Sequence, residues 1–178
     1  MKENPLPCTG LVIAGGAASR MGQNKALLRW RNGNLVQHLV QVILQTVKEI
    51  MIVGLDSADL FSDYPVQIVS DDKQNGPLGG ILLGLKTMNT DKALVVACDM
   101  PFVTESSIKI LWEQSENFDV VVPKTPDGLH PLFGIYSKSC IIPIERLLAR
   151  NNKKIIGFFN EVSCKIFYPE TDLESWQK

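Results

Sequence analysis

The sequence has no long apolar segment and no excess of charge of either sign. No run approaches the roughly 20 apolar residues that a membrane-spanning helix needs, so we expect no membrane segment. Eighteen Lys and Arg residues nearly balance 19 Asp and Glu residues, which leaves a formal net charge of −1 at pH 7. Without a basic surface to release counterions, binding to nucleic acid is not expected. A small anionic ligand is compatible, because it needs only a few cations and backbone N–H groups.

Cysteine and histidine are also scarce. The four cysteines are scattered and none belongs to a C-x-x-C pair, and there are only two histidines. This pattern disfavours a zinc site and is typical of reduced thiols in an intracellular protein. The first residues lack the apolar stretch of a signal peptide. We therefore expect a cytoplasmic protein.

Length and composition are those of one globular domain spanning residues 1–178. Apolar runs of strand length alternate with helical patterns. The predicted strands are 9–13, 50–53, 66–69, 93–97, 120–122 and 132–136, and the predicted helices are 35–47, 78–88, 104–114 (capped by Thr104) and 141–150. This alternation predicts an α/β fold with a mostly parallel central sheet. In such sheets ligands bind beyond the carboxyl ends of the strands, which directs attention to the loops after Ile13, Val69 and Ala97.

The loop after Ile13 carries the most informative pattern. Gly15 and Gly16 follow the strand, and glycine lets backbone N–H groups approach a ligand closely. Arg20 can bind two phosphate oxygens with its forked guanidinium, and Lys25 can place a point charge on a phosphate. The loop matches neither the P-loop pattern nor G-x-G-x-x-G. It suits a nucleoside triphosphate, and the competing interpretation is an exposed turn with incidental cations.

Carboxylates follow the other two strands. Asp99 ends the strand 93–97 in a Cys-Asp-Met-Pro segment, and a carboxylate beside a triphosphate is a typical Mg²⁺ ligand. Asp71 follows the strand 66–69 and precedes Gly-Pro-Leu-Gly-Gly at 76–80, where the last two glycines would let a flat nucleobase approach. The alternatives are that Asp99 caps the next helix and that Asp71 lies in a solvated turn.

The order and spacing of these three motifs resemble the MobA-type molybdenum cofactor guanylyltransferases, a family of nucleotidyltransferases. The first-loop match runs through Ile13, Ala14, Gly15, Gly16, Arg20, Met21, Gly22 and Lys25. The likeness extends from about Leu11 to about Phe159. It implies one Rossmann-like three-layer αβα domain, with nucleotide bound by the N-terminal half and acceptor by the C-terminal half. The implied nucleotide contacts are Ile13, Ala14, Gly15, Gly16, Lys25, Asp71 and Asp99. The implied catalytic residues are Arg20, Lys25 and Asp99, with Mg²⁺ held by Asp99.

The reaction that the resemblance implies is transfer of GMP from GTP to a molybdopterin-type pterin cofactor, with release of pyrophosphate. A molybdenum-insertion protein and molybdoenzyme acceptors are the further partners that it implies. The sequence departs from the family at two places. Gly54 stands where the family has an Asn after the second strand, and the Asn-x-Asn-Thr-Pro segment that helps to hold the pterin is missing. His130-Pro131 looks like the family's His/Gln-Pro segment, although such a His is more often a strand-start residue than a catalyst.

Other functions stay open at this point. A cytidylyltransferase for the same pterin and a sugar-phosphate nucleotidyltransferase share the first-loop signature, and the segment 76–80 favours guanine over these two. A non-catalytic nucleotide-binding relative would be compatible with the departures from the family. A pure interaction module would leave Arg20, Lys25 and Asp99 unexplained.

Overall fold

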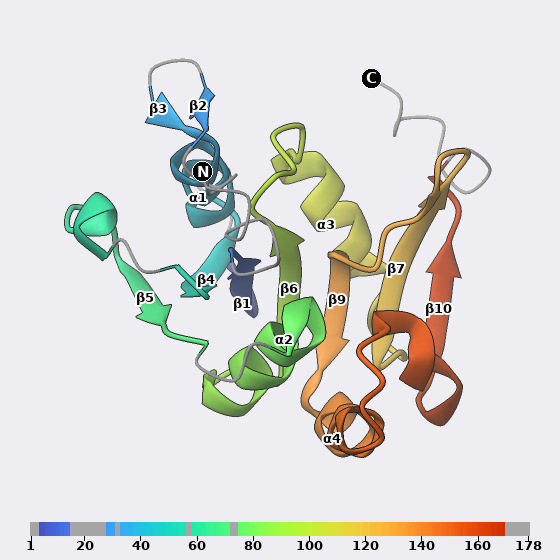
Figure 1. Ribbon diagram of the computed structural model, residues 1–178. Helices are drawn as coiled ribbons and strands as arrows, with labels where there is room; N and C mark the ends of the chain where they lie inside the picture. The colour runs from blue at the N-terminus through green and yellow to red at the C-terminus, as the bar shows by residue number, and fades with distance from the viewer. Residues whose placement is uncertain (1–3, 15–27, 31–32, 56–57, 72–74, 170–178) are drawn as a thin grey trace.

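A mixed β-sheet forms the centre of the fold (Figure 1). The computed structural model describes residues 4–14, 28–30, 33–55, 58–71 and 75–169. The sheet order is β5 (Val66–Val69), β4 (Val47–Val53), β1 (Leu6–Ile13), β6 (Lys92–Ala97), β9 (Phe133–Ser137), β7 (Val120–Thr125) and β10 (Cys164–Phe167). Only β9 runs antiparallel to its neighbours along this path. The predicted α/β class with a mostly parallel sheet is confirmed.

Two short antiparallel pairs complete the described strands. β8 (Gly128–Leu129) folds back on the end of β7 as a hairpin, and β2 (Arg29–Trp30) pairs with β3 (Gly33–Asn34) in a separate ribbon. Gly128 has a φ of 129°, a conformation that glycine adopts without a steric penalty, which accounts for its place in the hairpin turn.

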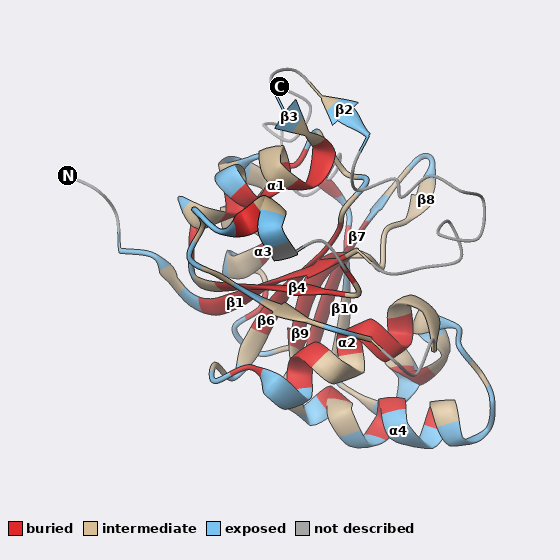
Figure 2. Cartoon of the chain, turned by 60° about the vertical axis from the view of Figure 1, so that its left-hand side comes forward, coloured by how far each residue is buried: buried red, intermediate tan, exposed pale blue. Residues whose placement is uncertain are grey.

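Helices cover both faces of the sheet, as Figure 2 shows with the buried strands between two helical layers. One face carries α1 (Leu35–Leu44) and α3 (Glu105–Glu113). The other carries α2 (Gly76–Thr87), α4 (Ile141–Ala149) and the 3-10 helix η5 (Ile155–Glu161). Successive strand side chains point to opposite faces, so Val12 belongs to the first core while Leu11 and Ile13 belong to the second. The predicted three-layer αβα arrangement is therefore confirmed.

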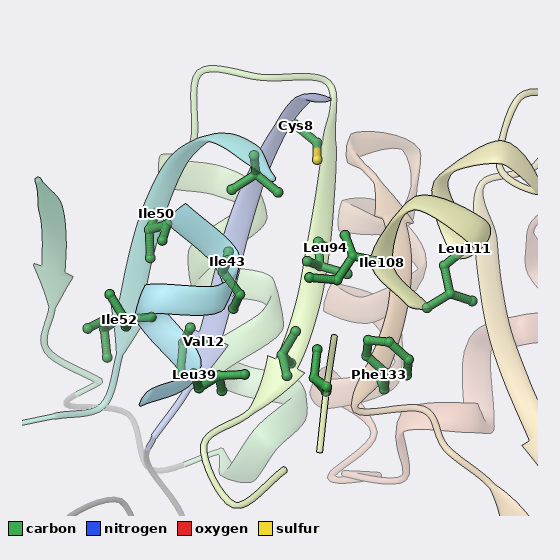
Figure 3. Close-up of a cluster of buried hydrophobic side chains, with 14 of the residues drawn as sticks. Cys8, Val12, Leu39, Ile43, Ile50, Ile52, Leu94, Ile108, Leu111 and Phe133 are labelled. Atoms are coloured by element: carbon green, nitrogen blue, oxygen red, sulfur yellow. The ribbon is translucent and has the colours of Figure 1, made fainter. Parts of the chain in front are cut away.

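The core under α1 and α3 shows how the sequence builds these layers (Figure 3). The apolar stripe of α1, with Leu39 and Ile43 at its centre, packs on Val12 of β1 and Ile52 of β4. Burying an aliphatic side chain of this size stabilises the fold by about 1.5–3 kcal/mol. Gly10 of β1 lets α1 approach, because a Cβ there would lie 2.5 Å from Ile43 Cγ2.

The ends of the helices agree with the sequence except at one place. Thr104 caps α3 in a reciprocal capping box with Ser107, and Pro143 lies in the first turn of α4. The predicted helix 35–47, however, ends at Leu44 because Val47 begins β4. Val47 is buried in either conformation, so its hydrophobicity alone could not separate helix from strand.

Two short 3-10 helices, η3 (Ala58–Phe61) and η4 (Lys138–Cys140), link the larger elements. Within the described part of the chain, none of the helices has the length and apolar character that crossing a membrane requires.

Candidate active site

The carboxyl ends of four strands line up at one edge of the sheet, which we call the strand-end rim. In the sheet register Ile13 lies opposite both Val53 of β4 and Ala97 of β6, and Val53 lies opposite Val69 of β5. The backbone continues this alignment past the strands, since the Ala14 N–H donates to the Val53 carbonyl over 2.9 Å. The three loops that the sequence singled out thus start from one edge.

The first of these loops is described only at its beginning. Ile13 is buried with its side chain in the core under α2, and Ala14 is half-buried. Because the Ala14 N–H is bound to Val53, a ligand contact from Ala14 would use its carbonyl oxygen or methyl group. The remaining predicted site residues of this loop lie outside the described residues: Gly15, Gly16, Arg20, Met21, Gly22 and Lys25.

The amino terminus of α2 packs directly on the end of β1. A Cβ at Gly80 would lie 3.4 Å from Ile13 Cδ1, and one at Gly79 would lie 2.5 Å from Asn75 Cβ. Both glycines are buried, Gly80 against Ile13 and Gly79 against Asn75 at the start of the same helix, so they form no open surface for a flat nucleobase. This packing sets the first-turn N–H groups, the positive end of the helix dipole, beside the rim, where they favour an anion.

Asp99 lies in the turn that follows β6. The Met100 N–H donates to the Ala97 carbonyl over 3.3 Å and closes the turn, and Asp99 is exposed. The alternative that Asp99 caps the next helix is wrong, because the cap of α3 is Thr104. Asp99 therefore stands at the rim as an exposed carboxylate.

Asp71 belongs to the same rim but not to the same cluster. It is half-buried and follows the end of β5 by two residues. Because β5 and β6 are three strand spacings apart, the ends of the strands that lead to the two aspartates are separated by roughly 14 Å. The two carboxylates therefore extend from different parts of the rim. Among the residues that the structure describes, no group of three or more acidic, His or Cys side chains is arranged to hold a metal.

Gly54, where the sequence departs from the MobA-type pattern, has a structural reason. Its φ is 80°, and its N–H donates to the Val69 carbonyl over 2.9 Å at the rim. Glycine adopts this left-handed conformation freely, and Asn is one of the few other residues that tolerate it. Gly54 and the Asn of the pattern therefore satisfy the same backbone requirement, although glycine offers no side-chain contact.

The two histidines have structural neighbours. His130 precedes β9, and its Nε2 lies 2.7 Å from Thr125 Oγ1 across the base of the β7–β8 hairpin. This agrees with the interpretation of His130 as a strand-start residue. His38 is half-buried in α1, with its ring centroid 6.3 Å from that of Trp30.

Three of the four cysteines are poor candidates for a nucleophile. None of the four, all within the described residues, forms a disulfide. Burial raises the pKa of the Cys8 and Cys140 thiols to about 12, and burial also raises the pKa of Cys164. Thiols with raised pKa values are poorly reactive at neutral pH, so covalent catalysis through these three side chains is not supported.

A pair of residues at the far end of the rim was not recognised in the sequence. The Lys124 ammonium, at the end of β7, lies 5.8 Å from the centroid of the Tyr168 ring, just past β10. The two residues are distant in the sequence and belong to no spacing pattern. Only the parallel pairing of β7 with β10 brings them together.

The three-layer αβα fold, with two aspartates and the amino terminus of α2 at the strand-end rim, is compatible with a nucleotidyltransferase, and this protein is an enzyme of that class. More specifically, the chain belongs to the family of MobA-like NTP transferase domains, whose sequence model matches residues 10–162.

Individual relatives agree with this assignment. The chain is 38% identical over 156 residues to a "Probable molybdenum cofactor guanylyltransferase" of Pelotomaculum thermopropionicum, covering 86% of this chain and 75% of the relative. It is 35% identical over 170 residues to a protein of the same name from Carboxydothermus hydrogenoformans, covering 96% of this chain and 86% of the relative.

Solved structures share the fold at lower identity. Molybdopterin-guanine dinucleotide biosynthesis protein A of Archaeoglobus fulgidus superposes with a TM-score of 0.77 and 22% identity, covering 92% of this chain and 84% of that one. A manganese complex of Rv0371C from Mycobacterium tuberculosis superposes with a TM-score of 0.68 and 12% identity, covering 93% and 89%.

Proposed function

We propose that this protein transfers GMP from GTP to the phosphate of a molybdopterin-type acceptor and releases pyrophosphate, as a molybdenum cofactor guanylyltransferase. The observation that carries the proposal is the alignment of the ends of β5, β4, β1 and β6, which brings Asp71, Asp99 and the loop after Ile13 to one rim. The names of the most similar relatives supply the identity of donor and acceptor.

The N-terminal half would bind the nucleotide. Gly15 and Gly16 would present backbone N–H groups to the phosphates, and Arg20 and Lys25 would neutralise charge on the triphosphate and on the departing pyrophosphate. The first turn of α2 lies at the same rim and would add its helix dipole. Asp71, at the end of a strand three spacings from β6, would accept hydrogen bonds from the base or ribose.

The residues of the rim fit a Mg²⁺ ion that is held largely by the substrate. Mg²⁺ typically takes one or two protein carboxylates, phosphate oxygens and water, and Asp99 offers one exposed carboxylate at the rim. When bound, the ion would neutralise charge on the phosphates. Asp99 would fix its position relative to the loop after Ile13.

The reaction needs little covalent chemistry from the protein. An oxygen of the acceptor phosphate attacks the α-phosphorus of GTP, a new P–O–P bond forms, and the bond to the β-phosphate breaks. The attacking phosphate is ionised near neutral pH, so no general base is required. The protein contributes by holding the two anionic groups in line and by stabilising the developing charge.

The C-terminal half would then bind the acceptor. We also propose that the reaction takes place in the cytoplasm. Supply of the pterin by a molybdenum-insertion protein, and onward transfer to molybdoenzymes, would complete the sequence of steps.

The test of this function is ligand stabilisation followed by turnover. With Mg²⁺ present, GTP at a hundredfold excess over its Kd should stabilise the fold by about 2.7 kcal/mol, measured as a thermal shift, while CTP should have little effect. Addition of molybdopterin under anaerobic conditions should release pyrophosphate. Stabilisation by CTP alone would reassign the protein as a cytidylyltransferase, and a response to neither nucleotide would contradict the proposal.

A further inference from the structure

The strand-end rim continues past Asp99 to the other side of the sheet. β7 is antiparallel to β9, and β9 is antiparallel to β6, so β7 runs parallel to β6; β10 in turn runs parallel to β7. Figure 1 shows β7 and β10 side by side at the right-hand edge of the sheet. Their carboxyl ends therefore reach the same rim as the nucleotide loops, and the Lys124–Tyr168 pair lies there.

Strand alternation decides on which face of the sheet this pair lies. Val120 and Val122 of β7 belong to the core under α2 and α4, so Lys124, two residues further, points to the same side. Leu129, the register partner of Lys124 in the hairpin, also packs against that core. Lys124 thus shares the face of α2, whose first turn lies at the rim.

The same alternation places His130 and Thr125 on the other face of the sheet, away from Lys124. Val121 packs in the core under α1 and α3, and Thr125 follows it at an even spacing. The hydrogen-bonded distance between Thr125 and His130 places both on that opposite face. The Lys124–Tyr168 pair and the Thr125–His130 pair therefore lie on opposite faces of the sheet, and only the first pair shares the face of α2.

The spacing of the strands fits an extended acceptor. β7 is two strand spacings from β6 and β10 is three, which places Lys124 and Tyr168 roughly 10–15 Å along the rim from Asp99. Tyr168 is 43% exposed and Lys124 is exposed, so an aromatic surface and a cation face solvent together. An acceptor with its phosphate near Asp99 would extend its ring system over β9 toward this pair.

We propose that Lys124 and Tyr168 bind the ring system of the acceptor, a flat and negatively charged heteroaromatic group. The ring contacts the exposed surface of the Tyr168 phenol, and the Lys124 ammonium lies beside the negative charge. The inference rests on the proposed function, because it assigns residues to the acceptor of that reaction.

Direct binding of pterins, without GTP or turnover, tests this assignment. Pterin-6-carboxylate and unsubstituted pterin are fluorescent and differ by one negative charge, so fluorescence anisotropy can report the Kd of each. Tyr168→Ala should weaken both pterins about tenfold through lost stacking, and Tyr168→Phe should restore binding. Lys124→Gln should weaken pterin-6-carboxylate about threefold and pterin by less than about twofold.

Thr125→Val is the matched control, because it alters the same hairpin on the opposite face. It should bind both pterins as the wild type does. Equal affinities of wild type and Tyr168→Ala would overturn the proposal, as would an equal loss in the Thr125→Val variant, which would indicate a general disturbance of the hairpin.

Nucleotide binding separates failure of this inference from failure of the proposed function. All four variants should keep the thermal shift produced by GTP and Mg²⁺. A Lys124→Gln variant that loses that shift would place Lys124 on the triphosphate instead and overturn the assignment to the acceptor. If Tyr168→Ala weakens pterin binding but GTP causes no thermal shift in the wild type, the proposal that GTP is the donor is wrong. The assignment of Tyr168 to the pterin ring is then still supported.

Discussion

The two halves of the strand-end rim are built differently. In the half that we propose binds the nucleotide, called the nucleotide half, β5, β4, β1 and β6 are parallel and end in register, and backbone hydrogen bonds continue the alignment past the strand ends. In the half that we propose binds the acceptor, called the acceptor half, the antiparallel β9 lies between β6 and β7, and a hairpin projects past the strand ends. The first half thus depends on backbone geometry and helix packing, and the second presents individual side chains. This difference would suit an enzyme whose nucleotide donor is bound mainly by the backbone and whose acceptor is selected by individual side chains.

The largest effect should come from the carboxylate that stands nearest the boundary of the two halves. Asp99→Asn should lower the rate of pyrophosphate release on the order of 10³-fold, since the metal's charge stabilisation is worth several kcal/mol. Because Asp99 is exposed, the thermal stability of the Asp99→Asn variant without ligand should stay near that of the wild type. Asp63→Asn, an exposed carboxylate away from the rim, is the control and should turn over normally. Normal turnover by Asp99→Asn with Mg²⁺ would remove the metal role.

A pair of glycines, one from each half, should separate helix packing from strand pairing. At Gly134 in β9 a Cβ would lie 2.6 Å from the Val121 carbonyl oxygen, so Gly134→Ala should destabilise the fold by about 2 kcal/mol. At Gly80 in α2 the closest contact would be an ordinary 3.4 Å, and alanine favours the helix by about 1 kcal/mol, so Gly80→Ala should be neutral or stabilising. Urea unfolding measures both, and equal losses would contradict this account of the two halves.

The smallest effect concerns an acidic clamp in the acceptor half. Asp119 accepts hydrogen bonds from the hydroxyl groups of Ser139 and Ser137 and from the Ser163 N–H, which ties β7 to the segments before α4 and β10. The bond from Ser139 is the main reason that the pKa of Asp119 lies below its usual 3.8.

The pH dependence of this clamp follows from the direction of the shift. A carboxyl whose pKa is lowered on folding stabilises the fold above its unfolded pKa, and this stabilisation is lost as the pH falls through the folded value. The wild type should therefore exceed Asp119→Asn in stability at pH 6 by less than about 1 kcal/mol, since the group is largely solvated. The difference should shrink below pH 4 in urea titrations. A difference that grows on acidification would contradict the hydrogen-bonded carboxylate.

The comparison also explains what could be predicted from the sequence. The strand 66–69 and the capped helix beginning after Thr104 were recognised because burial and capping leave local patterns. β10 was missed, since its four residues show no regular alternation of burial. The Asp119 clamp and the Lys124–Tyr168 pair were also missed, because their partners are far apart in the chain and meet only through sheet pairing.

The positions of glycines were predictable, but their roles were not. Gly79 and Gly80 suggested an open surface for a base, whereas in the structure both are buried near the start of α2. Gly54 suggested a lost ligand contact, whereas its positive φ shows a backbone demand. Glycine thus serves packing at one position and a left-handed backbone conformation at another. Only the tertiary structure distinguishes the two roles.

The β7–β8 hairpin has a consequence for how such an enzyme can diversify. Its turn, at Pro126 and Asp127 before Gly128, is exposed and supports no other described element of secondary structure. Lengthening or recasting that turn would reshape the surface next to Lys124 while the aligned ends of β1, β4 and β6 stay fixed. If Lys124 and Tyr168 bind the acceptor as proposed, changes at this one turn would alter acceptor preference and leave the donor side of the rim unchanged.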